Sequence, residues 1–417
     1  MSQPVKVAVY CLASLAGIIL AIVVAVFVTV QTDWFKNRIR EKIVAATENA
    51  TGGRVEIGKF NYDWRGLTAT VEPFIVHGRE PAFSPPFFRA DKIQIGLRII
   101  SALKKEVDIA SVAVEKPQIY VTVAPDGTTN VPTPRIPRSK QNFAEQLLDL
   151  KVQHFALRDG FAEYNFQRIP LDIQGNALQA TLGYEPSGPR YTGTISSHEL
   201  HVSAPQIKHP IVFDLYTKVA LGRNSIQVLE TRLSSQGSSI EMKGAVSDLA
   251  APKAALEISA AVPVKELNQA FGLPLESTGG FKFSGSGSVE INPLQYKVEG
   301  RLTGRGLAYA YKDTSVKNIV LDSRVEATPA RINLRNLDVS AMNGHFRGEA
   351  QLSDFKKVTL NGTVQSFSLQ QLALLGQREV GELSGTLDGT VHLDAVLARG
   401  HLTGLREGTK RPSHSLG

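Results

Sequence analysis

The sequence predicts a mainly β protein in which an N-terminal transmembrane helix precedes antiparallel β structure with a few short helices. Val7 to Val30 is a run of 24 residues without a charge or a proline. From Arg54 onward apolar residues alternate with polar ones, the period of a half-buried strand. Gly, Asn, Asp and Pro separate about twenty such segments, as in hairpins and meanders.

The apolar run is long enough to be a membrane anchor. At ~1.5 Å per residue it covers about 36 Å, against a hydrocarbon core of ~30 Å. The alternative is a cleaved signal peptide, but signal cores span about 7–15 apolar residues and no small-x-small cleavage site follows this run. Cys11, the only cysteine, lies within it, so the rest of the chain has no disulfide.

Charge alone does not orient this anchor. Lys6 precedes it, whereas Lys36, Arg38, Arg40 and Lys42 follow it, and a naive positive-inside count places the large part in the cytoplasm. Long domains translocate largely regardless of charge, however, and short N-terminal tails usually stay inside. We therefore expect a cytoplasmic tail at residues 1–6 and the bulk of the chain outside the cytoplasm.

Four helical segments are expected, one before the strands and three short ones among them. Asp33 to Ala50 is amphipathic and is followed by Gly52 and Gly53, which end helices. Asn142 to Leu150 follows a Pro-rich loop. Val264–Gly272 and Ser368–Gly376 align at a shift of 104 residues, which predicts a weak repeat of a helix followed by a meander. Chance similarity between Gly-rich alternating segments is the alternative.

The last residues differ from the rest. The alternation stops after Leu397, and residues 399–417 are polar and basic, so we expect a disordered tail there. The second copy of the repeat is then incomplete, which suggests a shortened member of a longer kind of protein.

The sequence contains no recognisable catalytic constellation. It has no nucleophile elbow, phosphate-binding loop, dinucleotide fingerprint or cysteine pair. His198 and His201 lie three apart, which in a regular strand places them on opposite faces and disfavours a shared metal. The net charge of +7 is scattered rather than clustered. We therefore expect no enzyme activity, no cofactor, no metal site and no nucleic-acid partner.

An ordered series of short motifs resembles the AsmA family, the membrane-anchored relatives of TamB in Gram-negative envelopes. The series comprises Thr51–Gly58, Ala90–Ile93, Val107–Ile109, Glu115–Ile119, and Asp126-Gly127 with Asn130. A later segment, Leu372 to Gly389, resembles the family's C-terminal modules. Residues 140–360 resemble the family only in their general alternation of apolar and polar residues, and the chain is short for the family.

The resemblance implies an elongated, twisted, U-shaped β-sheet, a groove whose concave apolar face carries lipid acyl chains, as in chorein-like bridge lipid-transfer proteins. It implies a single-pass bacterial inner-membrane protein whose bulk lies in the periplasm and which moves phospholipids between the inner and outer membranes. The expected segments are a tail (1–6), a membrane helix (7–30), a juxtamembrane amphipathic helix (31–53), an AsmA-like β segment (54–130), a Pro-rich loop and helix (131–150), a β groove segment (151–262), a helix-plus-meander segment (263–398) and a tail (399–417).

Alternation by itself does not determine what covers the apolar face. A sheet with one apolar face buries it against another sheet, against itself by closure, or against a ligand. If the ligand is lipid, its acyl chains lie along the apolar residues of the clearest strands. These lining residues are Ile93, Ile95, Leu97, Ile119, Val121, Phe213, Leu215 and Val219. The alternative function is a structural or assembly factor that pairs its sheet edges with outer-membrane or other envelope proteins.

Overall fold

The computed structural model describes residues 32–98, 109–133, 143–167, 170–205, 207–249, 251–272, 275–290, 295–311, 314–354, 356–370, 385–398 and 401–407. The expected anchor Val7–Val30, most of the Pro-rich loop, Val107-Asp108, most of the second-copy helix and residues 408–417 lie outside these ranges. Among the helices inside them, none combines the length and apolarity needed to cross a bilayer.

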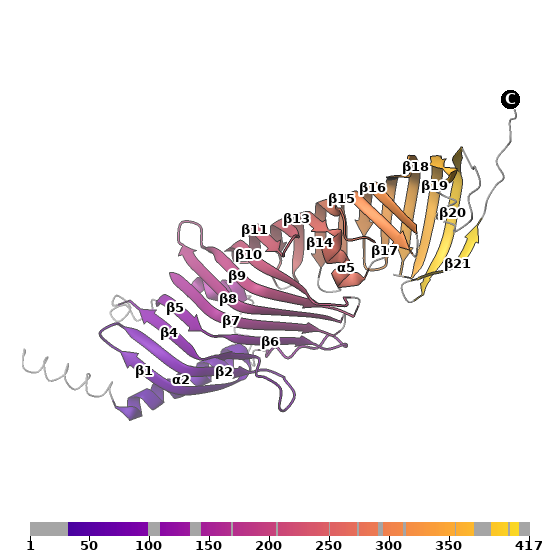
Figure 1. The fold of residues 1–417 in the computed structure, drawn as a ribbon. Coiled ribbons are helices and arrows are strands. Elements are labelled where there is room, and N and C mark those ends of the chain that lie inside the picture. The colour runs from indigo at the N-terminus through magenta and orange to yellow at the C-terminus, as the bar shows by residue number, and fades with distance from the viewer. Residues whose placement is uncertain are drawn as a thin grey trace, which may run out of the picture.

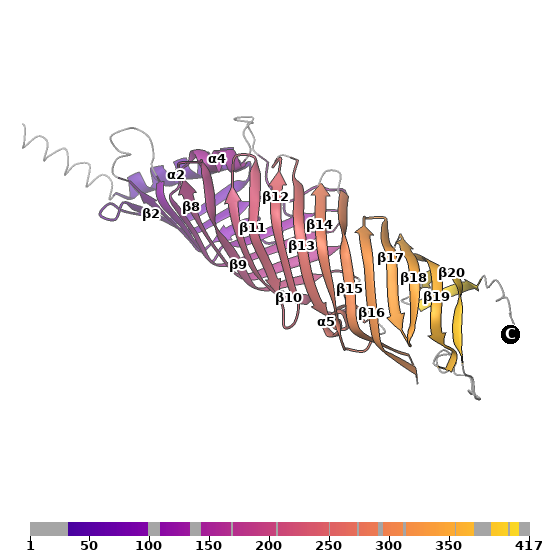
Figure 2. The same cartoon turned by 90° about the horizontal axis from the view of Figure 1, so that it is seen from above.

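The described chain is mainly β and forms one long, twisted sheet of 21 strands (Figures 1 and 2). From β7 to β21 each strand pairs with the next along the chain, so the sheet grows as a meander. The strands are β1 Arg54–Asp63, β2 Thr68–His77, β3 Phe88–Ala90, β4 Lys92–Leu97, β5 Ile109–Glu115, β6 Gln118–Val123, β7 His154–Phe166, β8 Leu171–Glu185, β9 Arg190–Ser203, β10 Ile211–Leu221, β11 Ser225–Ser234, β12 Ser239–Ser247, β13 Lys253–Pro263, β14 Gly280–Glu290, β15 Gln295–Tyr311, β16 Thr314–Ala327, β17 Arg331–Ala341, β18 Gly344–Ser353, β19 Lys357–Ser368, β20 Thr386–Ala398 and β21 His401–Glu407.

The sheet is mixed, which corrects the expectation of a purely antiparallel one. β7 pairs in parallel with both β5 and β6, and antiparallel with β8. A parallel neighbour requires a crossover rather than a tight hairpin. The segment that contains the Pro-rich loop and the helix α4 (Phe143–Asp149) joins β6 to β7 and is that crossover.

Near the N-terminal end two strands are each broken into collinear halves. β2 pairs with both β3 and β4, and β7 pairs with both β5 and β6. The break between β5 and β6 lies at Lys116, whose φ is 49°, and at the fully buried Pro117. Across from it β7 has a bulge at Asp159, with φ of 55°, so both neighbours bend together.

The three expected helices that fall in the described ranges are all present. α2 spans Asp33–Thr51 and α4 spans Phe143–Asp149. α5 spans Val264–Phe271 and ends at Gly272, which adopts the left-handed conformation common at helix C-termini. The second copy of the repeat cannot be compared because its helix lies outside the described residues.

Cross-strand register divides the sheet into two chemically different faces. Directly opposed residues share a face, so the pairs that extend from Leu215 can be followed from strand to strand. Leu215 opposes Leu233, Leu233 opposes Ile240, and Ile240 opposes Ala260. We call the face that carries these side chains the apolar face and the other the polar face. The same tracing carries the apolar face from β1 to β20.

Bulges keep the apolar face continuous where the alternation slips. In β9 the extra residue Glu199, with φ of 55°, lies between Ser197 and Leu200, both of which face the apolar side. In β17 Asn336, with φ of 51°, does the same before Leu337. A slip of one residue without a bulge would turn the rest of a strand over.

The expectation of a disordered tail from residue 399 is wrong for its first part. His401–Glu407 form β21, which pairs antiparallel with β20. Leu402 opposes Leu397, and the exposed edge of β20 supplies backbone groups for a further strand even where the side-chain pattern is weak.

Candidate functional site

The eight predicted lining residues all lie on the apolar face. Ile93, Ile95 and Leu97 are on β4 and face Val114, Val112 and Ile109 of β5. Ile119 and Val121 are on β6 and face Ala162 and Tyr164 of β7. Phe213, Leu215 and Val219 are on β10. All eight side chains are half-buried. Whether they line a lipid site stays a prediction.

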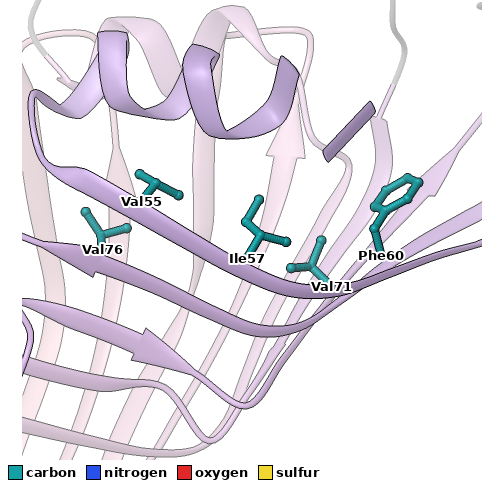
Figure 3. Close-up of a cluster of buried hydrophobic side chains, with 5 residues drawn as sticks. All are labelled: Val55, Ile57, Phe60, Val71 and Val76. Atoms are coloured by element: carbon teal, nitrogen blue, oxygen red, sulfur yellow. The ribbon is translucent and has the colours of Figure 1, made fainter. Parts of the chain in front are cut away.

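At the N-terminal end α2 covers the apolar face. Figure 3 shows Val55, Ile57, Phe60, Val71 and Val76 pointing from β1 and β2 toward the helix above them. These five side chains are buried, and three apolar side chains of α2 pack on them. The α2 residues are Ile39, Ile43 and Val44. This end of the face is therefore a small two-layer core.

Beside it α4 covers a second part of the apolar face. Leu148 of α4 and Val152 are buried against Tyr191 of β9. The Tyr191 hydroxyl accepts a hydrogen bond from Val152 N at 2.8 Å and donates one to Leu147 O at 3.1 Å. Burial raises the pKa of Tyr191 above its usual value. One phenol thus fixes the C-terminal end of the crossover helix to the sheet.

The far end of the apolar face also contains buried side chains. Leu337, Phe346 and Phe367, from β17, β18 and β19, form a cluster with half-buried neighbours on the same face. The Phe346 ring lies over Gly362, where a Cβ would come within 2.6 Å of it. Aromatic rings laid flat over glycines bury themselves on the sheet surface.

Between these ends, from β10 to β14, the apolar face is open. In this stretch its apolar side chains are all half-buried and none is fully buried. No helix or strand in the described ranges packs over it as α2 does over β1. The open stretch carries Phe213, Leu215 and Val219 on β10, Val228 and Leu233 on β11, Met242 on β12, Leu256 and Ile258 on β13, and Phe281 and Phe283 on β14.

The polar face carries several ion pairs between neighbouring strands. Lys243 Nζ lies 3.0 Å from Glu257 Oε2. Arg301 donates two hydrogen bonds to Asp322, from Nε to Oδ1 at 3.0 Å and from Nη2 to Oδ2 at 2.5 Å. The Arg301 guanidinium holds the pKa of Asp322 below its usual value. Such exposed pairs stabilise the sheet only slightly, but they mark this face as the solvated one.

The close approach of strands makes glycine necessary at several places on the apolar face. Gly285 and Gly300 oppose each other on β14 and β15. A Cβ on Gly300 would lie 2.4 Å from Ser284 O, and one on Gly285 would lie 2.1 Å from Glu299 O. Gly348 and Gly362 form a second opposed pair. These pairs allow the strands to approach closely, with the missing side chains on the apolar side.

At one margin of the open stretch α5 packs against the strand ends. Glu266 of α5 accepts hydrogen bonds from Ser235 and Ser238, each 2.5 Å long, in the turn between β11 and β12. Burial acts to raise the pKa of Glu266, but these bonds and backbone N–H groups lower it overall. A cavity of about 770 Å³ beside α5 is lined in part by Phe213 and Ala270.

The motifs that resemble the AsmA family occupy structural joints. Asn130 is buried; its amide donates to Tyr120 O at 2.7 Å and accepts from Thr122 N at 2.9 Å. Asp126 accepts a hydrogen bond from the Thr128 hydroxyl, which lowers its pKa, and Gly127 completes the turn. Gly53 joins α2 to β1, where a Cβ would lie 2.2 Å from His77 O.

The histidines near residue 200 do not form a metal site with other described residues. The Glu199 bulge places His198 and His201 on the same polar face, so the argument from strict alternation was wrong about their sides. His198 Nδ1 pairs instead with Asp214 Oδ1 at 3.0 Å. Within the described ranges no three His, Cys, Asp or Glu side chains are grouped to hold a metal ion.

One carboxylate pair was not anticipated from the sequence. Burial and the neighbouring charge of Asp172 raise the pKa of Glu163. The two residues lie on adjacent strands, β7 and β8, nine positions apart in the chain, on the polar face. Only the register of β8 against β7 brings them together, so no local sequence signal could have found them.

Comparison with known proteins adds no identification, since no family model, no curated protein and no solved structure matches this chain.

Proposed function

We propose that this protein binds lipid acyl chains along the open stretch of its apolar face and supports phospholipid transport to, or homeostasis of, the outer membrane. It acts as an inner-membrane-anchored periplasmic protein whose sheet is a hydrophobic groove. The anchor, the compartment and the cargo follow from the apolar run Val7–Val30 and from the resemblance to the AsmA family.

One observation carries the proposal: a single sheet bears one apolar face over its whole length, and that face lacks a protein cover from β10 to β14 in the described chain. An apolar surface of this extent in water is unfavourable, at roughly 25 cal/mol per Å². A soluble protein seldom exposes a contiguous apolar patch beyond a few hundred Å² without a ligand or partner.

Acyl chains suit this surface better than a polar or compact ligand. Its side chains are mainly aliphatic, and its edges lead directly to water, where headgroups can remain hydrated. Burying methylene groups contributes about 0.8 kcal/mol each, without a need for specific hydrogen bonds. The binding is passive and requires no cofactor, and the residues named along β10 to β14 would contact the chains.

A photo-crosslinking experiment on the full chain tests the proposal. A benzophenone amino acid is placed at Leu215 or Ile258 on the open stretch, and at Val212 on the polar face of β10 as the control. Val212 is 40% exposed, so the probe is accessible there. We expect phospholipid adducts by mass spectrometry from the first two positions and not from Val212. Equal adduct yields from both faces would refute the proposal that lipid binds along the apolar face.

A paired substitution tests the same face without a probe. Leu215→Asp combined with Val219→Asp should reduce the yield of lipid adducts from Ile258 while the β-sheet circular dichroism is unchanged, because charged side chains repel acyl chains. Val212→Asp, a Val-to-Asp change on the same strand but the other face, is the matched control and should leave the yield unchanged.

The assembly-factor alternative is favoured by one observation. β1 is an edge strand that pairs only with β2 among the described strands, so beyond Val55, whose N–H donates to Glu48, its other edge is open to an added strand. Crosslinks from Glu56 or Lys59 on β1 to outer-membrane proteins, in the absence of lipid adducts from Ile258, would favour this alternative over lipid binding.

A further inference from the structure

The only two tryptophans of the chain, Trp34 and Trp64, are both exposed. The exposed fraction is 69% for Trp34 in the first turn of α2 and 53% for Trp64 in the turn between β1 and β2. Large aromatic side chains are normally buried because they carry much apolar area. Two such exposures invite the question of whether they belong to one surface.

The packing of α2 answers that question, because the helix runs back along β1. At its C-terminal end Glu48 Oε1 accepts a hydrogen bond from Val55 N at 3.0 Å. Further toward its N-terminus, Asn37 and Arg40 lie with Gly58 around one cavity. Earlier residues of α2 therefore lie over later residues of β1. Figures 1 and 2 both place the start of α2 and the far end of β1 at the same extremity of the molecule.

Basic side chains accompany the two indoles. Arg38 and Lys42 follow Trp34 at four-residue spacing, which places all three on one side of α2, away from Ile39 and Ile43. Arg38 and Lys42 are exposed. Arg65 follows Trp64 in its turn and is also exposed. The surface thus combines two amphipathic rings with exposed positive charge at one end of the sheet.

We infer that this surface, made of Trp34, Arg38, Lys42, Trp64 and Arg65, docks into the interfacial zone of a bilayer that contains anionic phospholipid. Indole rings favour the headgroup level because the ring is apolar while its N–H still finds hydrogen-bond partners. Lys and Arg near an anionic surface add about 1 kcal/mol each. The inference rests on the proposed function, since it assumes that the chain is membrane-anchored.

The choice of a bilayer rather than a protein partner follows from position and charge. Trp34 comes four residues after the apolar run Val7–Val30, so the chain itself carries a membrane-seeking segment to this end of the molecule. The fold places the turn that carries Trp64 at the same end of the molecule as the start of α2. Docking of both would hold β1, the first strand of the apolar face, against the bilayer.

Tryptophan fluorescence of the full chain reconstituted into phosphatidylcholine–phosphatidylglycerol vesicles tests the inference. Trp34→Phe leaves Trp64 as the only tryptophan, and Trp64→Phe leaves Trp34. We expect lipids brominated near the headgroup end of the acyl chain to quench both variants, and the emission of each to shift to the blue. Trp64 is the decisive probe, because a membrane helix at residues 7–30 would by itself keep Trp34 close to lipid.

An emission of Trp64 that stays at the wavelength of indole in water, unchanged by brominated lipid and fully quenched by acrylamide, would overturn the inference. Arg65→Glu should reduce the quenching of Trp64 in anionic vesicles. Quenching of Trp64 as strong in this variant as in the parent would show that the charge of Arg65 does not contribute to docking. If Trp64 is not quenched but Ile258 still forms lipid adducts, the docking inference fails and the proposed function stands. If Ile258 forms no lipid adducts but Trp64 is quenched, the proposed function fails and the docking of this surface stands.

Discussion

Single polar groups hold the helices over the sheet, and Tyr191 is the clearest case. Its side chain is 1% exposed, and its hydroxyl bridges two backbone groups of the segment that contains α4. Residues 44 positions apart are thereby joined. The phenol ring also fills the small core beneath the helix.

Tyr191→Phe should destabilise the protein while keeping the ring packed. The substitution leaves the buried Val152 N–H without its acceptor, which costs about 1–3 kcal/mol. Chemical denaturation should show this loss as a lower midpoint. Tyr216→Phe, on the exposed polar face of β10, is the control and should change the midpoint little. Equal midpoints for the two variants would contradict the role given to the Tyr191 hydroxyl.

The hydrogen bonds to Glu266 predict that the docking of α5 depends on pH. Its pKa is lower in the folded chain than in the unfolded one, so its contribution to stability is present above the unfolded value and is lost as the pH falls through the folded value. Glu266→Gln should therefore reduce the free energy of unfolding at pH 7 by about 1 kcal/mol, which is measured as a lower melting temperature. The difference between variant and wild type should shrink as the pH falls through the lowered pKa of Glu266. A difference that is constant with pH would contradict this sign.

At the scale of elements, bulges and glycines shape the strands. The bulge at Glu199 preserves the apolar face, and the glycine pair Gly285 and Gly300 allows two strands to approach closely. Both features are local departures from ideal alternation, and both serve the continuity of one face.

Gly300→Ala should be destabilising, by roughly 1–3 kcal/mol, because the new methyl group would meet the Ser284 carbonyl and the Phe283 ring. Gly389→Ala is the matched control on the same face, since nothing lies within 4 Å of its Cβ position. The control should be neutral or slightly stabilising, because alanine restricts the unfolded chain. Thermal unfolding of the two variants compares them directly, and equal melting temperatures would argue against close strand approach at Gly300.

At the scale of the whole molecule, α2 and α4 cover the apolar face at its N-terminal end, and the face is open from β10 to β14. Ile57 is 4% exposed beneath α2, whereas Ile258 on the same face is half-buried and has no helix above it. The same residue type therefore serves a core in one place and a free surface in the other. In the described part of the chain, the core beneath α2 and the residues proposed to contact lipid are spatially separated.

This separation predicts opposite outcomes for one substitution at two sites. Ile57→Asp should destabilise the fold by about 3 kcal/mol or more, since it buries an unpaired charge. Ile258→Asp should change the melting temperature little but reduce lipid adducts from a probe at Leu215. Calorimetry and the crosslinking yield measure the two effects. A large loss of stability in Ile258→Asp would mean that protein, not lipid, covers the open stretch.

The predicted lining residues share one face of the sheet, because the face of a strand residue depends on local alternation. Phe213 and Leu215 share a face with Ile93 for this reason, although they lie far apart in the chain. The same reasoning was wrong for His198 and His201, since it assumed a regular strand and the Glu199 bulge lies between them.

Most of the strands, the three described helices and the division into an apolar and a polar face could be predicted from the sequence, because all of these depend on periods of two or 3.6 residues within short segments. Three arrangements appear only in the tertiary structure: β7 runs parallel to β5 and β6, α2 and α4 cover one end of the apolar face, and the elements that carry Trp34 and Trp64 lie at the same end of the molecule. These arrangements depend on contacts between distant residues, such as Tyr191 with Leu147, which no local pattern encodes.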